Sequence, residues 1–171
     1  MSTLKIGICG WGNVATGLYK IAKNNIESIK KQGNLDIEIV VIGARRDNPN
    51  CKPENVIIER DIFNVVNHDI DVMVELIGGV DVAKDLILKA LKKKKHVVTA
   101  NKAVIYNHGD EIFACAKENG VKVLFESSVC AGTPIIKLLT QELSANKISK
   151  ISGMLNGCLL YTSDAADEGG S

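Results

Sequence analysis

The sequence is poor in the features that mark several classes of protein. Aromatic residues make up only 4% of its 171 residues, and 21 basic residues against 20 acidic ones leave a net charge of +1. Few rings disfavour a surface for stacking nucleic-acid bases, and near-neutrality gives no electrostatic reason to bind nucleic acid or an acidic membrane. No apolar run approaches the ~20 residues that span a bilayer, and no signal peptide is recognisable. We therefore expect neither a nucleic-acid nor a membrane partner.

The cysteines give no sign of a disulfide framework or a zinc site. There are five of them, an odd number, scattered and without CxxC spacing. A hydrophobic share of 46% and a charged share of 24% are ordinary for a globular protein. The composition predicts a globular domain in a reducing compartment, and we expect a cytoplasmic location.

Short apolar runs alternate with segments of helical character. The predicted strands are 5–9, 38–43, 56–58, 72–77, 96–99 and 121–125, and the predicted helices are 13–31, 62–67, 82–95 and 108–119. Apolar strands between helices are typical of a parallel sheet covered on both faces. The predicted fold class is therefore α/β, a doubly wound parallel sheet of the Rossmann-like kind.

The pattern changes near residue 126. Thr133-Pro134 begins a predicted helix that ends at Leu143, and a predicted strand follows at 148–155. We interpret 1–130 as a first domain and 131–157 as the beginning of a second, α+β domain that is truncated. Residues 158–171 show neither helical nor strand periodicity, and we interpret them as a non-native tail.

The turn after the first predicted strand carries the first candidate site. It reads Gly10-Trp11-Gly12-Asn13-Val14-Ala15, a G-x-G-x-x-A motif between a strand and a helix. Gly10 permits the tight turn, Gly12 lets a pyrophosphate approach the backbone, and Ala15 is small enough for close packing. The N–H groups at the helix start suit the phosphate charge. The motif predicts a dinucleotide site, the alternative being a glycine-rich turn that binds nothing.

The end of the second predicted strand bears on which dinucleotide is bound. Arg45 and Arg46 come directly after it, and Asp47 follows them. Arginine suits the 2′-phosphate of NADP, whereas a carboxylate accepts from the 2′-hydroxyl of NAD. The order predicts NADP, with NAD possible if Asp47 takes the ribose.

Two more strands end in residues that suit a cofactor crevice. The glycine pair Gly78-Gly79 lets the backbone approach a cofactor ribose, and Thr99 ends the strand that precedes Lys102. A lysine just past a strand's carboxyl end can reach a nicotinamide or a substrate oxygen. The alternative for Lys102 is a solvated surface lysine.

The segment 126–134 is a loop of small residues that includes one carboxylate, Glu126. A carboxylate with several unpaired backbone carbonyls can bind a hard cation through oxygen. The alternative is a plain domain hinge.

Taken in order, segments 6–14, 43–49, 74–79, 96–103 and 125–136 resemble homoserine dehydrogenase in its monofunctional form, over about residues 4–157. The resemblance implies an NAD(P)-dependent oxidoreductase that interconverts L-homoserine and L-aspartate 4-semialdehyde in threonine, methionine and isoleucine biosynthesis. It also implies that 1–130 is the NAD(P)-binding domain, that 131–157 begins the substrate and dimerisation domain, and that the full-length protein is a homodimer.

The resemblance further implies roles for individual residues. Trp11, Asn13 and Val14 match the cofactor-binding turn, Arg45 the position facing the ribose phosphate, and Lys102 the catalytic lysine at the nicotinamide and substrate. A sodium ion is implied at the Glu126 side chain and the carbonyls of Val129, Ala131 and Thr133.

The family's substrate-binding carboxylates and second catalytic lysine belong to a later segment, so we expect this chain to be inactive alone. One alternative is a non-catalytic NADP-binding module or sensor. Another is a two-domain oxidoreductase of the glucose–fructose oxidoreductase kind, whose E-K-P segment is absent from 100–103.

Overall fold

The computed structural model describes residues 2–152. The chain divides into two compact units, the first ending at Phe125 and the second beginning at Glu126. This division falls five residues before the boundary expected at 130.

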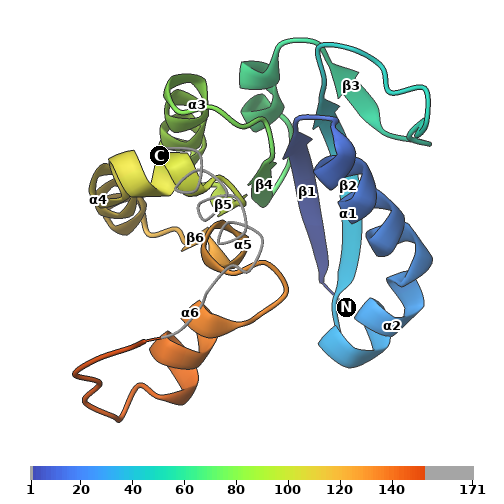
Figure 1. Ribbon diagram of the computed structural model, residues 1–171. Helices are drawn as coiled ribbons and strands as arrows, with labels where there is room; N and C mark the ends of the chain where they lie inside the picture. Colours follow the sequence, from blue (N-terminus) through green and yellow to red (C-terminus); the bar gives the residue numbers. More distant parts are fainter. Residues whose placement is uncertain (1, 153–171) are drawn as a thin grey trace, which may run out of the picture. The chain divides into compact units, whose positions relative to one another are not determined.

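The first unit is built on a parallel sheet (Figure 1). Its strands are β1 (Thr3–Cys9), β2 (Asp36–Gly43), β3 (Ile57–Glu59), β4 (Val72–Glu75), β5 (His96–Thr99) and β6 (Val123–Leu124). The six strands lie in the order β3-β2-β1-β4-β5-β6, and every pair is parallel. This is the strand order of the Rossmann fold, with its reversal point between β1 and β4. The predicted fold class is confirmed.

The helices of this unit agree with the predicted ones in place; the helix predicted over 62–67 agrees at both ends, and the others differ at one end or both. They are α1 (Asn13–Asn24), α2 (Ile26–Gly33), the 3₁₀ helix η1 (Ile62–Asn67), α3 (Asp81–Lys92) and α4 (Lys102–Asn119). The single helix predicted over 13–31 is wrong, because Asn25 leaves the helical conformation. Its backbone N–H and its side-chain amide both donate to the carbonyl of Ile21, which ends α1.

The start of α4 was also predicted wrongly. The helix begins at Lys102 and not at 108, because the Asn101 side chain caps it by accepting from the Val104 N–H at 3.2 Å. His108 has a non-helical φ of −135°, so the predicted start coincides with a kink inside the helix.

Two apolar clusters form the core, and neighbouring strand residues contribute to different ones. Val41 and Met73 pack with side chains of η1, α3 and α4, whereas Ile42 and Val74 pack with residues of α1. Because successive side chains of a strand point to opposite faces, the sheet is covered on both sides. Near-continuous apolar strands therefore have the environment that they require.

The second unit is short and helical where it is described. It contains α5 (Glu126–Val129), α6 (Ile135–Lys137) and a π-helical segment, η2 (Leu138–Glu142). The observed helical segment therefore ends at Glu142, one residue before the predicted end at Leu143. The predicted strand 148–155 is wrong over 148–152, which have no regular structure and pair with none of the described strands. Its remainder and the segment 158–171 lie outside the described residues. Within residues 2–152, no helix is long and apolar enough to cross a membrane.

Candidate functional site

The glycine turn after β1 has one crowded and one open position. Gly10 has a φ of +103°, and a Cβ there would lie 2.6 Å from the carbonyl oxygen of Leu76. Gly12, the N-cap of α1, has a φ of −87°, and a Cβ there would meet no described atom within 4 Å. The first helical hydrogen bond runs from Thr16 N to Gly12 O, so the N–H groups of 13–15 have no carbonyl of their own helix to bind. Such a turn suits an anionic group.

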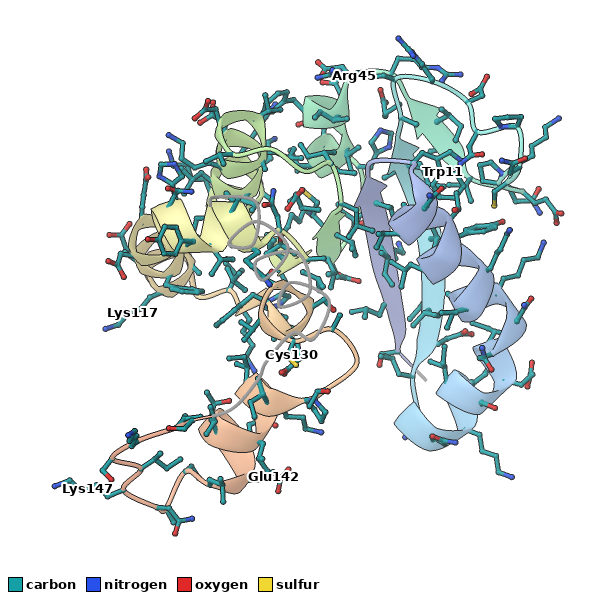
Figure 2. The ribbon with its side chains drawn as sticks, viewed as in Figure 1. Trp11, Arg45, Lys117, Cys130, Glu142 and Lys147 are labelled. Carbon is teal, nitrogen blue, oxygen red and sulfur yellow. The ribbon has the colours of Figure 1, made fainter. Side chains whose placement is uncertain are left out.

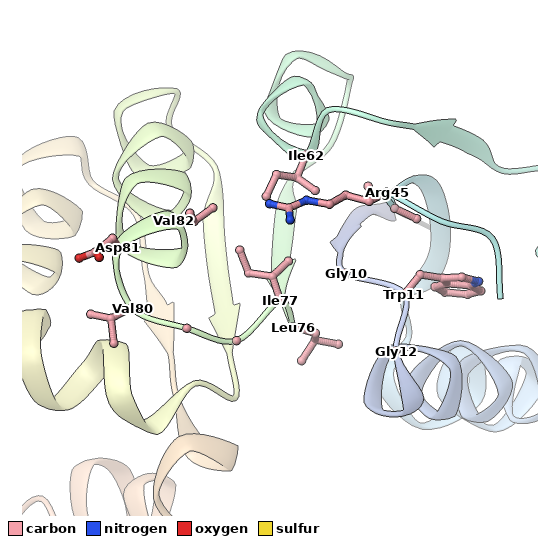
Figure 3. Close-up of a pocket in the computed structure, with 14 residues that line it drawn as sticks. Gly10, Trp11, Gly12, Arg45, Ile62, Leu76, Ile77, Val80, Asp81 and Val82 are labelled. Carbon is pink, nitrogen blue, oxygen red and sulfur yellow. The ribbon is translucent and has the colours of Figure 1, made fainter.

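The side chains of Trp11 and Ala15 pack in the core and anchor this turn. The Trp11 indole is 9% exposed, stands edge-on to Tyr19 at 5.5 Å between ring centroids, and donates from Nε1 to the Cys51 carbonyl at 3.1 Å. Ala15 is buried against the same cluster. Figure 3 shows the indole directed away from Leu76 and Ile77. Trp11 therefore fixes the backbone of the turn from the side opposite Leu76 and Ile77.

A cleft of about 530 Å³ opens beside this turn. It is lined by Gly10–Gly12, Gly43–Arg45, Ile62 and Leu76–Val82 (Figure 3). The loops after β1 and β4 both contribute, so the cleft lies at the reversal of strand order, where open α/β sheets bind their ligands. Gly78 and Gly79 have φ values of +71° and +75°, and a Cβ at either would meet no described atom within 4 Å. Both glycine loops therefore offer open backbone to a ligand.

A second cleft, of about 390 Å³, shares Leu76 and Gly78 with the first. Val14, Glu75 and Ala100–Ala103 complete its lining, so this cleft contains Lys102. The Lys102 side chain is exposed and belongs to the first residue of α4. Asn101, directly before it, donates from Nδ2 to the Gly79 carbonyl at 2.6 Å. The structure thus brings Val14, Gly78 and Lys102 together around one cleft.

The arginines after β2 are placed differently from one another. Arg45 is exposed and lines the first cleft, and Figure 2 shows it beyond the end of β2, while Figure 3 shows its guanidinium reaching toward Ile62. Arg46 is exposed and Asp47 accepts from Arg60 Nη2 at 2.7 Å. Arg60 also donates to the Ala44 carbonyl, which holds the pair beside the strand end. The Asp47 carboxylate is therefore engaged by a guanidinium.

The residue that sequence reasoning missed is Glu75. It is 0% exposed at the end of β4, and its Oε1 accepts from Ile77 N at 2.9 Å and from Gly78 N at 3.3 Å. Its Oε2 accepts from Thr99 Oγ1 at 2.6 Å, and Thr99 is itself 1% exposed. Thr99 thus lies inside the protein and contacts Glu75. The signal was present, since a carboxylate in an apolar strand is rarely buried unless it is hydrogen-bonded.

Cys9 is the buried neighbour of this carboxylate. Burial and, to a smaller extent, the charge of Glu75 raise the pKa of the Cys9 thiol from 9.0 to about 12. A thiol that keeps its proton is a poor nucleophile. Cys9 is therefore a packing residue of the core.

In the second unit, two of the four expected cation donors, the Glu126 carboxylate and the Thr133 carbonyl, already take part in hydrogen bonds. The Glu126 carboxylate accepts from Ile136 N at 2.7 Å and Lys137 N at 3.0 Å, which caps α6. The Thr133 carbonyl accepts from Ile135 N at 2.8 Å. Within residues 2–152, no cluster of three His, Cys, Asp or Glu side chains suits a metal ion. Glu126 is thus a helix-capping residue as the chain is folded.

Comparison with known proteins identifies the relatives of this fold. Residues 10–126 match the family model "Homoserine dehydrogenase, NAD binding domain". The homoserine dehydrogenase of Pseudomonas aeruginosa is 49% identical over 158 residues, which are 92% of this chain and 36% of that protein. The crystal structure of a homoserine dehydrogenase from Thiobacillus denitrificans superimposes with a TM-score of 0.79 at 38% identity, over 85% of this chain and 34% of that one.

A more distant relative is a hyperthermophilic archaeal homoserine dehydrogenase solved in complex with NADPH. It is 26% identical with a TM-score of 0.66, over 80% of this chain and 48% of that one. The chain thus spans about a third of the length of the bacterial relatives. The matched family model covers most of the first unit, including both glycine loops and Lys102. The chain belongs to the homoserine dehydrogenase family.

Proposed function

We propose that this chain is the NADP-binding part of a homoserine dehydrogenase, which interconverts L-homoserine and L-aspartate 4-semialdehyde. The observation that carries the proposal is the cleft at the reversal of strand order, where two glycine loops leave their backbones open. Residues 1–130 form the cofactor-binding domain in this proposal, and 131–157 begin the substrate and dimerisation domain.

The cofactor would lie along both clefts. The pyrophosphate would contact the backbone of Gly12, Asn13 and Val14 at the start of α1, where open N–H groups and the helix dipole favour negative charge. Gly78 and Gly79 would lie along the ribose of the nicotinamide half, which would enter the second cleft. When bound, the nicotinamide supplies the carbon that takes up or gives the hydride.

We propose that NADP is preferred over NAD. Arg45 lines the cleft with its guanidinium available for a 2′-phosphate, and Arg46 adds positive charge outside it. Asp47 is paired with Arg60, so it is drawn away from accepting a ribose hydroxyl. NADPH bound to the archaeal relative is consistent with this preference.

Binding measured by calorimetry tests the proposal on this chain. We expect NADPH to bind more tightly than NADH. Arg45→Ala should lower the affinity for NADPH by about tenfold and leave the affinity for NADH unchanged, since a charge-assisted contact to the 2′-phosphate is lost. Arg46→Ala is the matched control and should change NADPH affinity less. A wild-type chain that binds neither dinucleotide contradicts the proposed function.

Lys102 is proposed as the catalytic residue of this half. Its ammonium would lie near the substrate oxygen and stabilise the negative charge that develops there during hydride transfer. In a version of the enzyme that includes the later domain, Lys102→Ala should lower kcat far more than NADPH affinity. Unchanged turnover of homoserine would reject this role. A homodimer and a cytoplasmic location remain expectations for the full-length protein.

A sodium ion is proposed at Glu126 and the carbonyls of Val129, Ala131 and Thr133. The donors are all oxygens, which is the ligand type that hard cations prefer. Because Glu126 and the Thr133 carbonyl already accept backbone hydrogen bonds, an ion would share these oxygens with the start of α6. Its role would be to stiffen the loop at the start of the second unit.

A further inference from the structure

We infer that Glu75 is a positioning residue that holds the Gly78–Gly79 loop and the Lys102 loop together around the second cleft. The inference rests on the proposed function, and it concerns the nicotinamide half of the site. It assigns to one buried carboxylate the geometry of both walls of that cleft.

Glu75 is an unusual group to bury. Its side chain is 0% exposed, and among residues 2–152 its partners are N–H and O–H donors, with no basic side chain in an ion pair. A buried carboxylate is tolerated when its oxygens are hydrogen-bonded. Removing one donor lowers the stability of the protein, because the buried oxygen is then left without a partner. The sheet itself does not need it, because β4 pairs with β1 and β5 through its backbone. The position of its donors indicates what the side chain does.

The donors come from two loops that are distant in the sequence. Oε1 accepts from the backbone of Ile77 and Gly78, at the start of the glycine loop. Oε2 accepts from the Thr99 hydroxyl, and the same hydroxyl accepts from Asn101 N at 3.0 Å. One oxygen therefore serves each wall of the cleft.

Asn101 closes the chain of hydrogen bonds into a ring. Its Nδ2 donates to the Gly79 carbonyl at 2.6 Å, and its Oδ1 caps the helix that begins at Lys102. Both walls are thus tied twice, through Glu75 inside the protein and through Asn101 at the cleft. A ring of this kind fixes the spacing between the Gly79 carbonyl and the first turn of α4.

Glutamine cannot reproduce every hydrogen bond that the carboxylate makes in this ring. Glu75→Gln offers one acceptor oxygen, so an amide NH₂ would face either the Ile77 and Gly78 N–H groups or the Thr99 hydroxyl. In the second case Thr99 Oγ1, which already accepts from Asn101 N, would receive a second donor and its proton would need another acceptor. In the first orientation the glycine loop is released, and in the second the Thr99 hydroxyl loses the carboxylate oxygen that accepts its proton.

The test compares a whole dinucleotide with half of one. NADPH would occupy both clefts, whereas adenosine 2′,5′-bisphosphate would occupy only the end near Arg45. We expect Glu75→Gln to lower the affinity for NADPH by about tenfold in calorimetry and to leave the affinity for adenosine 2′,5′-bisphosphate unchanged. Thr99→Val should give the same pattern, and the double variant should be no weaker than the weaker single one, because both act on one ring.

Glu59→Gln is the matched control. Glu59 is a half-buried carboxylate of β3 that pairs with His68 at 2.8 Å and lines neither cleft among the described residues. It loses the same charge, and both affinities should remain those of the wild type.

The outcomes separate this inference from the proposed function. A Glu75→Gln chain that binds NADPH as the wild type does overturns the inference, and so does one that loses both probes equally, since that marks a general structural defect. If Glu75→Gln does not fold, Thr99→Val decides by the same two readouts. A wild-type chain that binds neither probe overturns the proposed function and this inference together.

Discussion

Two glycines of one turn are expected to respond to alanine in opposite ways. Gly10→Ala places a methyl group 2.6 Å from the Leu76 carbonyl oxygen on a backbone with a φ of +103°. The obstacle is backbone, held by the hydrogen bond from Leu76 N to the Cys9 carbonyl at 2.8 Å, so no side-chain rotation relieves it. Left-handed strain and overpacking together should cost about 2 to 5 kcal/mol of the free energy of unfolding. That is a large part of the about 5 to 15 kcal/mol that stabilises an ordinary domain.

Gly12→Ala should leave the fold nearly intact. Its φ of −87° suits any residue, and the new methyl group would meet no described atom within 4 Å. Alanine is a poorer N-cap than glycine, which costs about 1 kcal/mol at most. The methyl group would stand where we propose that the pyrophosphate lies, so NADPH affinity should fall by about tenfold or more.

Urea unfolding followed by circular dichroism, together with NADPH calorimetry, measures both variants on the same chain. The expected result is a lowered midpoint for Gly10→Ala and a normal midpoint with weak binding for Gly12→Ala. A Gly10→Ala midpoint equal to that of the wild type would refute the argument from the Leu76 carbonyl. A Gly12→Ala chain that binds NADPH normally would refute the argument from open space.

Two further predictions concern stability. Because the folded-state pKa of Cys9 is raised to about 12, the unfolded chain loses this proton first, and the free energy of unfolding should fall above pH 9 by about 1.4 kcal/mol per unit. Urea midpoints between pH 8 and 10 check this, and Cys9→Ala should fall less steeply. Asn101→Ala should cost about 1 kcal/mol through the lost cap of α4, whereas Asn101→Ser, which loses the donor to the Gly79 carbonyl equally but keeps a capping oxygen for Val104 N, should cost less. Equal losses in both Asn101 variants would argue against a capping role.

The parts of the fold that follow from local pattern could be predicted from the sequence. The apolar runs locate all six strands, because a buried parallel strand must be apolar on both faces. The turn at Gly10 could be placed for a similar reason, since its positive φ favours glycine.

Features that depend on a neighbour in space could not be predicted in the same way. The role of Glu75 requires that β4 lie beside β5, which brings Thr99 to its second oxygen. The family resemblance implies that Glu126 is a cation ligand, but sequence spacing did not indicate that its carboxylate accepts from the N–H groups of 136 and 137. In both cases the side chain's partners lie beyond its own element, where sequence spacing carries no information.

Trp11 gives the protein an optical property that follows from its place in the turn. It is the only tryptophan of the chain, and its indole is held by the Cys51 carbonyl and the ring of Tyr19. Fluorescence excited at the red edge of the protein's absorption spectrum therefore comes from this one indole, which lies one residue from Gly10 and one from Gly12. Its wavelength and lifetime would register a displacement of this turn, even where the rest of the sheet keeps its structure.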